Sequence, residues 1–70
     1  MKISARNVLK CKVKKVTDGM VNVEVVLELP GGQEVVSVVT KAAASRLGVA
    51  PGKDAYAVIK ATSVMLGVDD

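Results

Sequence analysis

Hydrophobic and polar residues alternate over much of the first half of the chain, with the period of two that is typical of half-buried strands. The clearest stretch is Met20–Leu29, where valine or leucine occupies every second position from Val21 onward. An earlier stretch, Val8–Val16, has apolar residues on one face and lysines on the other. Thr17–Gly19 lies between the two and favours a tight turn, so the pattern predicts a hairpin.

A third strand is predicted at Glu34–Thr40, after a turn signal at Pro30–Gly32. Valines at positions 35, 36, 38 and 39 make both faces of this segment apolar. A strand that is apolar on both faces is typically covered on both sides. We therefore expect its own core to cover one face and a neighbouring subunit to cover the other.

The second half of the chain predicts a helix followed by two strands. Lys41–Leu47 is rich in alanine, and Gly48 follows it where a helix-ending glycine belongs. After a turn at positions 51–54, Ala55–Ala61 reads as a fourth strand and Ser63–Val68 as a short fifth. This order predicts an all-β fold, a five-stranded OB-like barrel with one short helix between strands three and four.

The composition predicts one small domain, residues 1–70, that depends on other copies of itself. Half of the residues are hydrophobic, but Tyr56 is the only aromatic residue, and a core of small aliphatic side chains gives a lone domain of this size little stability. Cys11 is the only cysteine and there is no histidine, which excludes an internal disulfide and argues against zinc. Self-association remains as the source of further stability.

The same inventory argues against an enzyme. No histidine is present to act as a general base, and the acidic residues fall in turns, on polar strand faces or near position 70. Cys11 lies on the apolar face of the first strand, as a small buried hydrophobe would. We expect no catalytic residue, no metal-ligating residue and no catalytic cofactor. No apolar run is long enough to span a membrane, and residues 1–7 lack the hydrophobic region of a secretory signal, so a cytoplasmic protein without membrane contact is expected.

Two short polar clusters could carry a binding function. They are Ser4–Asn7, before the first strand, and Lys60–Ser63, between the last two. Each combines one cation with hydroxyl or amide groups, the mixture that neutralises and hydrogen-bonds a tetrahedral dianion. Small residues such as Ala5 and Ala61 let backbone N–H groups approach the anion. Considered alone, both clusters are better explained as solvated turn residues, which is what such side chains near strand ends usually are.

A row of lysines on the first strand offers an alternative function. Its members are Lys10, Lys12, Lys14 and Lys15. On an OB-like barrel this row could bind nucleic acid, but barrels that hold single strands stack the bases on aromatic side chains. With Tyr56 as the only aromatic residue, a solvated strand face is the favoured interpretation.

The two polar clusters also carry a resemblance to a known family. Residues 1–7 resemble the opening segment of the molbindins, also called Mop proteins, and Lys60–Leu66 resembles their closing motif. Between them, Gly19–Val25, Gly31–Gly32 and Leu47–Val49 fall where that family has similar segments. Together these segments cover nearly the whole chain, and their order and spacing are specific.

The resemblance implies an OB-like subunit that assembles as a homohexamer and binds molybdate or tungstate at subunit interfaces, without catalysis and without nucleic acid. Because the resemblance extends over the whole chain, it favours storage or homeostasis of molybdenum. By position, it implies these oxyanion-binding residues: Ser4, Ala5, Arg6, Thr40, Lys60, Ala61 and Ser63. Asn7 and Thr62 would support the loops. Cys11 is a departure, since the family commonly has glycine there.

Overall fold

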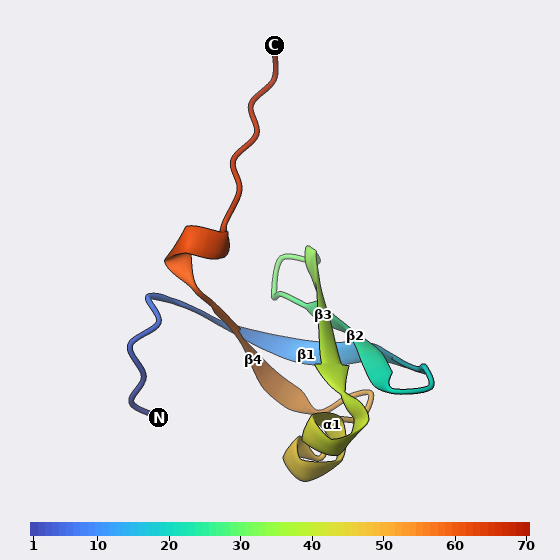
Figure 1. Cartoon of the computed structure of the whole chain (residues 1–70). Coiled ribbons are helices and arrows are strands. Elements are labelled where there is room, and N and C mark those ends of the chain that lie inside the picture. The colour runs from blue at the N-terminus through green and yellow to red at the C-terminus, as the bar shows by residue number, and fades with distance from the viewer.

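A computed structural model describes all residues, 1–70, and consists of four strands, one short helix and one 3₁₀ turn (Figure 1). The elements in chain order are β1 (Asn7–Asp18), β2 (Asn22–Glu28), β3 (Glu34–Thr40), α1 (Lys41–Leu47), β4 (Asp54–Ile59) and η1 (Ala61–Ser63). The first three strands and the helix fall where the sequence pattern predicts them. The helix lies between the third and fourth strands, as expected.

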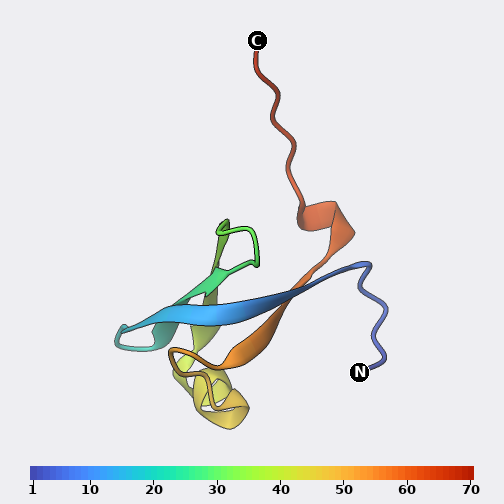
Figure 2. The same cartoon turned by 180° about the vertical axis from the view of Figure 1, so that it is seen from behind.

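The strands form one antiparallel sheet with the order β3-β2-β1-β4, which curls around its concave face (Figure 2). The long strand β1 serves two neighbours in succession. Its first half, Asn7–Lys12, pairs with β4, and its second half, from Lys12 to Asp18, pairs with β2. The start of β1 therefore lies beside the end of β4, although the two are about fifty positions apart in the sequence.

A β-bulge between Val13 and Lys15 lies where β1 leaves β4. Here the N–H of Val13 donates to the carbonyl oxygen of Lys53, and its carbonyl accepts from the N–H of Gly52, each at 2.8 Å. The turn that precedes β4 is thus held against the bulge. An extra residue in one strand bends that strand and increases its twist, which accounts for the curl of the sheet.

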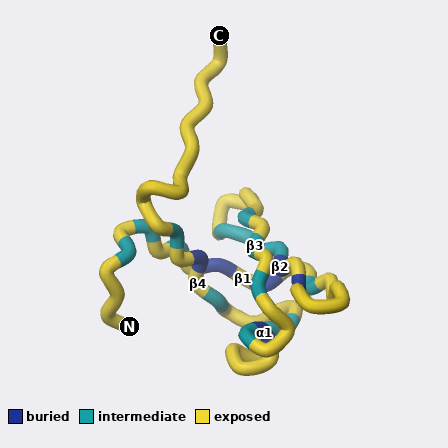
Figure 3. The backbone as a smooth tube through the Cα atoms, viewed as in Figure 1, coloured by how far each residue is buried: buried dark blue, intermediate teal, exposed yellow.

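The core is small and lies on the concave face, along the middle of the sheet (Figure 3). Its seven buried residues are all small or medium-sized: Cys11, Val13, Val23, Val25, Leu27, Ala44 and Ala57. Only Ala44 comes from outside the sheet, where α1 covers one end of the curl. Many other apolar side chains stay exposed in the single chain.

Two capping residues define α1. The side-chain oxygen of Thr40 accepts a hydrogen bond of 3.1 Å from the N–H of Ala43, which satisfies one of the free donors of the first turn. Gly48 ends the helix in the left-handed conformation, with φ of 67°, which a glycine adopts without strain. At seven residues this helix falls short of what a membrane crossing requires, and no other α-helix is present.

The prediction of a fifth strand at Ser63–Val68 is wrong for the single chain. The fourth strand ends at Ile59, Ala61–Ser63 forms the 3₁₀ turn η1, and the residues after it run out from the sheet as an unpaired arm. No strand of the same chain pairs with this segment, so β3 and β4 remain free edges and the sheet stays open. The all-β fold is confirmed, but a closed five-stranded barrel is not.

The two faces of β3 differ more than its sequence predicts. Val35 and Val39 are half-buried against the core, whereas Val36 and Val38 are 57% and 63% exposed on the other side of the sheet. The expected cover for this second face is not supplied by the chain itself.

Candidate functional site

The pairing of β1 with β4 brings the two polar clusters of the sequence together. Asn7, the first residue of β1, is the register partner of Ile59, the last residue of β4. The side-chain amide of Asn7 also donates to the carbonyl oxygen of Ile59 at 3.3 Å. Arg6 and Lys60 are the residues just outside this pair, so the ladder sets the two cations on adjacent chain segments.

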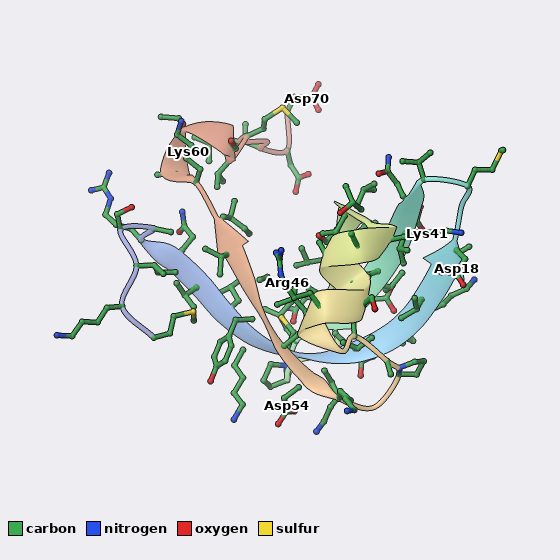
Figure 4. All side chains as sticks on the ribbon, turned by 60° about the horizontal axis from the view of Figure 1, so that its bottom comes forward. Asp18, Lys41, Arg46, Asp54, Lys60 and Asp70 are labelled. Atoms are coloured by element: carbon green, nitrogen blue, oxygen red, sulfur yellow. The ribbon has the colours of Figure 1, made fainter.

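Between these segments lies a hollow of about 550 Å³. Its lining consists of Ser4, Ala5, Arg6, Val58, Lys60, Ala61 and Thr62. Five of the seven predicted oxyanion-binding residues are therefore in one place. Lys60 is seen in Figure 4 where the chain leaves β4 for η1. The hollow is open to solvent, and all of these residues except Ala5 are exposed.

Neither cation of the hollow is engaged by a carboxylate. The three salt bridges of the chain involve only Lys12 and Lys14, so Arg6 and Lys60 have no acidic partner within hydrogen-bonding reach. Ser4 and Thr62 add hydroxyl groups to the same lining. A cation pair with hydroxyl donors and no competing carboxylate is suited to an anion that accepts several hydrogen bonds.

The turn η1 adds backbone donors on one side of the hollow. Within it, the N–H groups of Ser63 and Val64 donate to the carbonyl oxygens of Lys60 and Ala61, at 2.9 and 3.3 Å. The N–H groups of Ala61 and Thr62 lie at the start of η1, where no earlier carbonyl of the turn is placed to accept from them. Ala61 lines the hollow and has a small side chain, which is the basis on which the sequence predicts that an anion could approach these donors.

Two of the predicted site residues lie outside the hollow. Thr40 ends β3 and caps α1, and it does not line the hollow. Ser63 is the last residue of η1 and is likewise absent from the lining. Conversely, Val58 and Thr62 line the hollow. From the sequence, Thr62 is expected to play only a supporting role, and Val58 is overlooked because an apolar residue within a strand gives no sign of the polar hollow beside it.

Two of the four lysines in the row of β1 are paired within the chain. The Nζ atom of Lys12 lies 2.8 Å from a carboxylate oxygen of Asp54, and that of Lys14 contacts both Glu34 and Glu28. Hydrogen bonding and charge from Lys12 lower the pKa of Asp54, and those from Glu34 raise the pKa of Lys14. Half of the row is thereby neutralised, which weakens its case as a nucleic-acid surface.

Comparison with known families defines the class of protein that this fold and hollow represent. The family model described as the TOBE domain matches residues 3–66, which is most of the chain. The chain therefore belongs to the TOBE domain family.

The relatives of the chain place it more narrowly. It is 52% identical over 69 residues to a probable molybdenum-pterin-binding protein of Haemophilus influenzae, covering 99% of this chain and 100% of the other. MopII from Clostridium pasteurianum is a solved structure with 43% identity and a TM-score of 0.90, covering 96% of this chain and 100% of that one. Within the TOBE domain family the chain is a molbindin, or Mop protein.

A third similar structure is a longer protein. It is described as the cytoplasmic molybdate-binding protein ModG with molybdate bound, and it is 52% identical with a TM-score of 0.94. The match covers 99% of this chain but only 49% of ModG, so the chain spans about half of that protein.

Proposed function

We propose that this protein binds molybdate or tungstate, without catalysis, in the hollow between residues 4–6 and 60–62. The observation that carries the proposal is the position of Arg6 and Lys60. They come from opposite ends of the sequence, line one hollow and have no carboxylate partner. The Mop and ModG relatives, whose names and titles refer to molybdenum or bound molybdate, support molybdate as the anion.

We propose further that a second chain completes the site. The hollow is open and its polar side chains are exposed, so one chain surrounds only part of an anion. Pooling donors from two chains would exclude water and strengthen each hydrogen bond. The resemblance to molbindins supplies the expected assembly, a homohexamer, and two further ligands, Thr40 and Ser63, which would reach the anion only across such an interface.

In this proposal residues 1–70 act as one domain of a cytoplasmic protein, and the bound anion is stored or buffered. Storage is consistent with a chain that matches the Haemophilus influenzae relative over its whole length. A nucleic-acid-binding module is the alternative. Two observations argue against this alternative. Lys12 and Lys14 are ion-paired within the chain, and Tyr56 is the only aromatic side chain on which a base could stack.

Isothermal titration calorimetry tests the proposal directly. Molybdate, tungstate, sulfate and phosphate are titrated separately into the protein, and a single-stranded oligonucleotide is titrated in the same buffer. We expect molybdate and tungstate to bind tightly and sulfate to compete weakly. Equal affinity for sulfate would contradict a dedicated site. Oligonucleotide binding with a steep salt dependence, and no molybdate binding, would favour the alternative.

A further inference from the structure

Val58 differs from every other residue that lines the anion hollow. It is the only one of the seven that belongs to a strand, since residues 4–6 precede β1 and residues 60–62 follow β4. It is also the only one with a bulky apolar side chain, because the other two hydrophobic members are Ala5 and Ala61. The hollow therefore combines one apolar wall with polar groups on two segments outside the sheet.

The apolar wall is held in place by the β1–β4 ladder. Val58 is the register partner of Val8, and residues directly opposite in an antiparallel pair have their side chains on the same face. A β-branched side chain has few rotamers open to it. Arg6 and Lys60, by contrast, have long, exposed side chains with many rotamers. The two cations can therefore adjust to anions of different size, whereas Val58 keeps one shape.

An anion bound by Lys60 would lie against this wall. Lys60 comes two positions after Val58 and has extended backbone angles, with φ of −61° and ψ of 130°. Residues two apart in an extended segment point to the same face. This is the face away from the core, since the intervening alternation buries Ala57 and leaves Val58 48% exposed.

An apolar wall discriminates between anions of the same charge and shape. Molybdate and sulfate are both tetrahedral dianions, but sulfate is smaller and holds its water more strongly. Val58 has no group that could replace a lost hydrogen bond to water, so an anion placed against it is dehydrated on that side without compensation. The free energy of this dehydration is larger for the smaller ion, because ionic hydration strengthens as the radius falls.

We propose that Val58 is a specificity-determining residue, which makes the hollow favour molybdate over sulfate. The inference rests on the proposed function and deepens it. Arg6 and Lys60 supply affinity for any dianion, and the apolar wall supplies the choice among dianions. Selectivity then depends on a residue that forms no hydrogen bond to the ligand.

The test compares two anions in one variant and in its matched control. Val58→Thr keeps the shape of the side chain but places a hydroxyl in the wall, which donates to an anion or to a retained water. Val8→Thr makes the same change at the opposing position of the ladder, outside the hollow. Isothermal titration calorimetry gives the dissociation constants of sulfate and molybdate for each protein. Their ratio is the readout, because a general loss of stability or assembly weakens both anions alike.

We expect the ratio of the sulfate to the molybdate dissociation constant to fall by about tenfold in Val58→Thr, which corresponds to about 1.4 kcal/mol. The ratio should stay unchanged in Val8→Thr. An unchanged ratio in Val58→Thr, or an equal fall in both variants, would overturn the proposal while leaving molybdate binding in place. Absence of molybdate binding by the original protein would instead remove the proposed function, and this inference with it.

Two further variants separate the apolar wall from simple packing. Val58→Ala shortens the side chain and admits water to the wall, so it should also lower the ratio. Val58→Ile keeps the wall apolar and adds no hydrogen-bonding group, so the ratio should not fall below that of the original protein. Thermal unfolding shows that each variant folds, as expected for a half-exposed position. A fall in Val58→Ile as large as that in Val58→Thr would contradict the role given to the apolar wall.

Discussion

Asn7 and Ile59 are partners at one end of the β1–β4 ladder, and the side chain of Asn7 adds a second link by donating to the carbonyl oxygen of Ile59 at 3.3 Å. This pair joins two polar segments that the sequence separates by about fifty residues. Arg6 directly precedes Asn7 in the sequence, and Lys60 directly follows Ile59. The position of the candidate anion site is therefore a consequence of strand register.

The first prediction concerns this link. Asn7→Ala should lower the free energy of unfolding by about 0.5–1.5 kcal/mol, the usual net value of one hydrogen bond. It should also weaken molybdate binding, because the two sides of the hollow are held less firmly. Chemical denaturation and calorimetry measure the two effects. Asn22→Ala is the control, since the side chain of Asn22 forms no hydrogen bond in the chain. Identical effects of both substitutions would contradict the role given to Asn7.

The second prediction concerns the two cations. Arg6→Ala and Lys60→Ala should each weaken molybdate binding by about 1.5–3 kcal/mol, the range of hydrogen bonds to charged groups. Lys15→Ala removes the same charge from an exposed position on β1 that is outside the hollow, and it should change the affinity little. Calorimetry gives the dissociation constant of molybdate for each of the three variants, and these constants are compared with that of the original protein. If all three variants bind alike, the anion responds to net charge and not to this hollow.

The third prediction concerns Thr40, which caps α1. Thr40→Ala removes the acceptor of the 3.1 Å hydrogen bond from Ala43 and should lower the free energy of unfolding by about 0.5–2 kcal/mol. Thr40→Ser keeps a hydroxyl oxygen at the cap and should stay close to the original stability. Thermal unfolding monitored by circular dichroism compares the variants at one protein concentration. Equal midpoints for the alanine and serine variants would show that the cap contributes nothing.

The fourth prediction concerns pH. Lys12 lowers the pKa of the Asp54 carboxyl below its ordinary value of 3.8, through a hydrogen bond and through charge. A lowered carboxyl pKa stabilises the folded state above the ordinary value, and that stabilisation disappears as the pH falls through the folded-state pKa. Because both side chains are exposed, the effect on stability is small and is best followed at the carboxyl itself.

A carboxyl-detected NMR titration provides that measurement. Lys12→Ala should raise the titration midpoint of Asp54 toward 3.8. Lys10→Ala is the matched control and should move it less, since Lys10 acts on Asp54 through charge alone and as the weakest of the four causes. A midpoint that does not respond to Lys12→Ala would mean that the ion pair does not form in solution.

The sequence predicted the strands of the sheet and the helix because their patterns depend on interactions between residues close together in the chain. Alternation in Met20–Leu29 and the alanine run ending at Gly48 depend on near neighbours, so each could be assigned without knowing the rest of the fold. The prediction at Ser63–Val68 was wrong for the opposite reason. A strand needs a partner, and in the single chain no strand pairs with that segment, although β3 and β4 have free edges.

The candidate site was likewise predicted only in part. The Ser4–Asn7 and Lys60–Ser63 clusters were visible because each concentrates polar residues in a short segment, yet only the register of β1 with β4 brings them together. Val58 was missed because an apolar residue in a strand carries no sign of what it borders. Thr40 was assigned by resemblance, and within one chain its hydroxyl is used by α1.

The position of Asn7–Ile59 at the end of its ladder has a dynamic consequence. At its Lys12–Asp54 end the ladder is held by the continuation of β1 into its pairing with β2 and by the hydrogen bonds of Val13 to Lys53 and Gly52. The Asn7–Ile59 end has no such support, so backbone amides there open and exchange with solvent sooner. An anion held by both Arg6 and Lys60 would bridge the two strands at the end that opens most readily. Hydrogen exchange at this end should then slow on binding, while the Lys12–Asp54 end stays as it was, so the occupancy of the site could be read from the protection of a few amides.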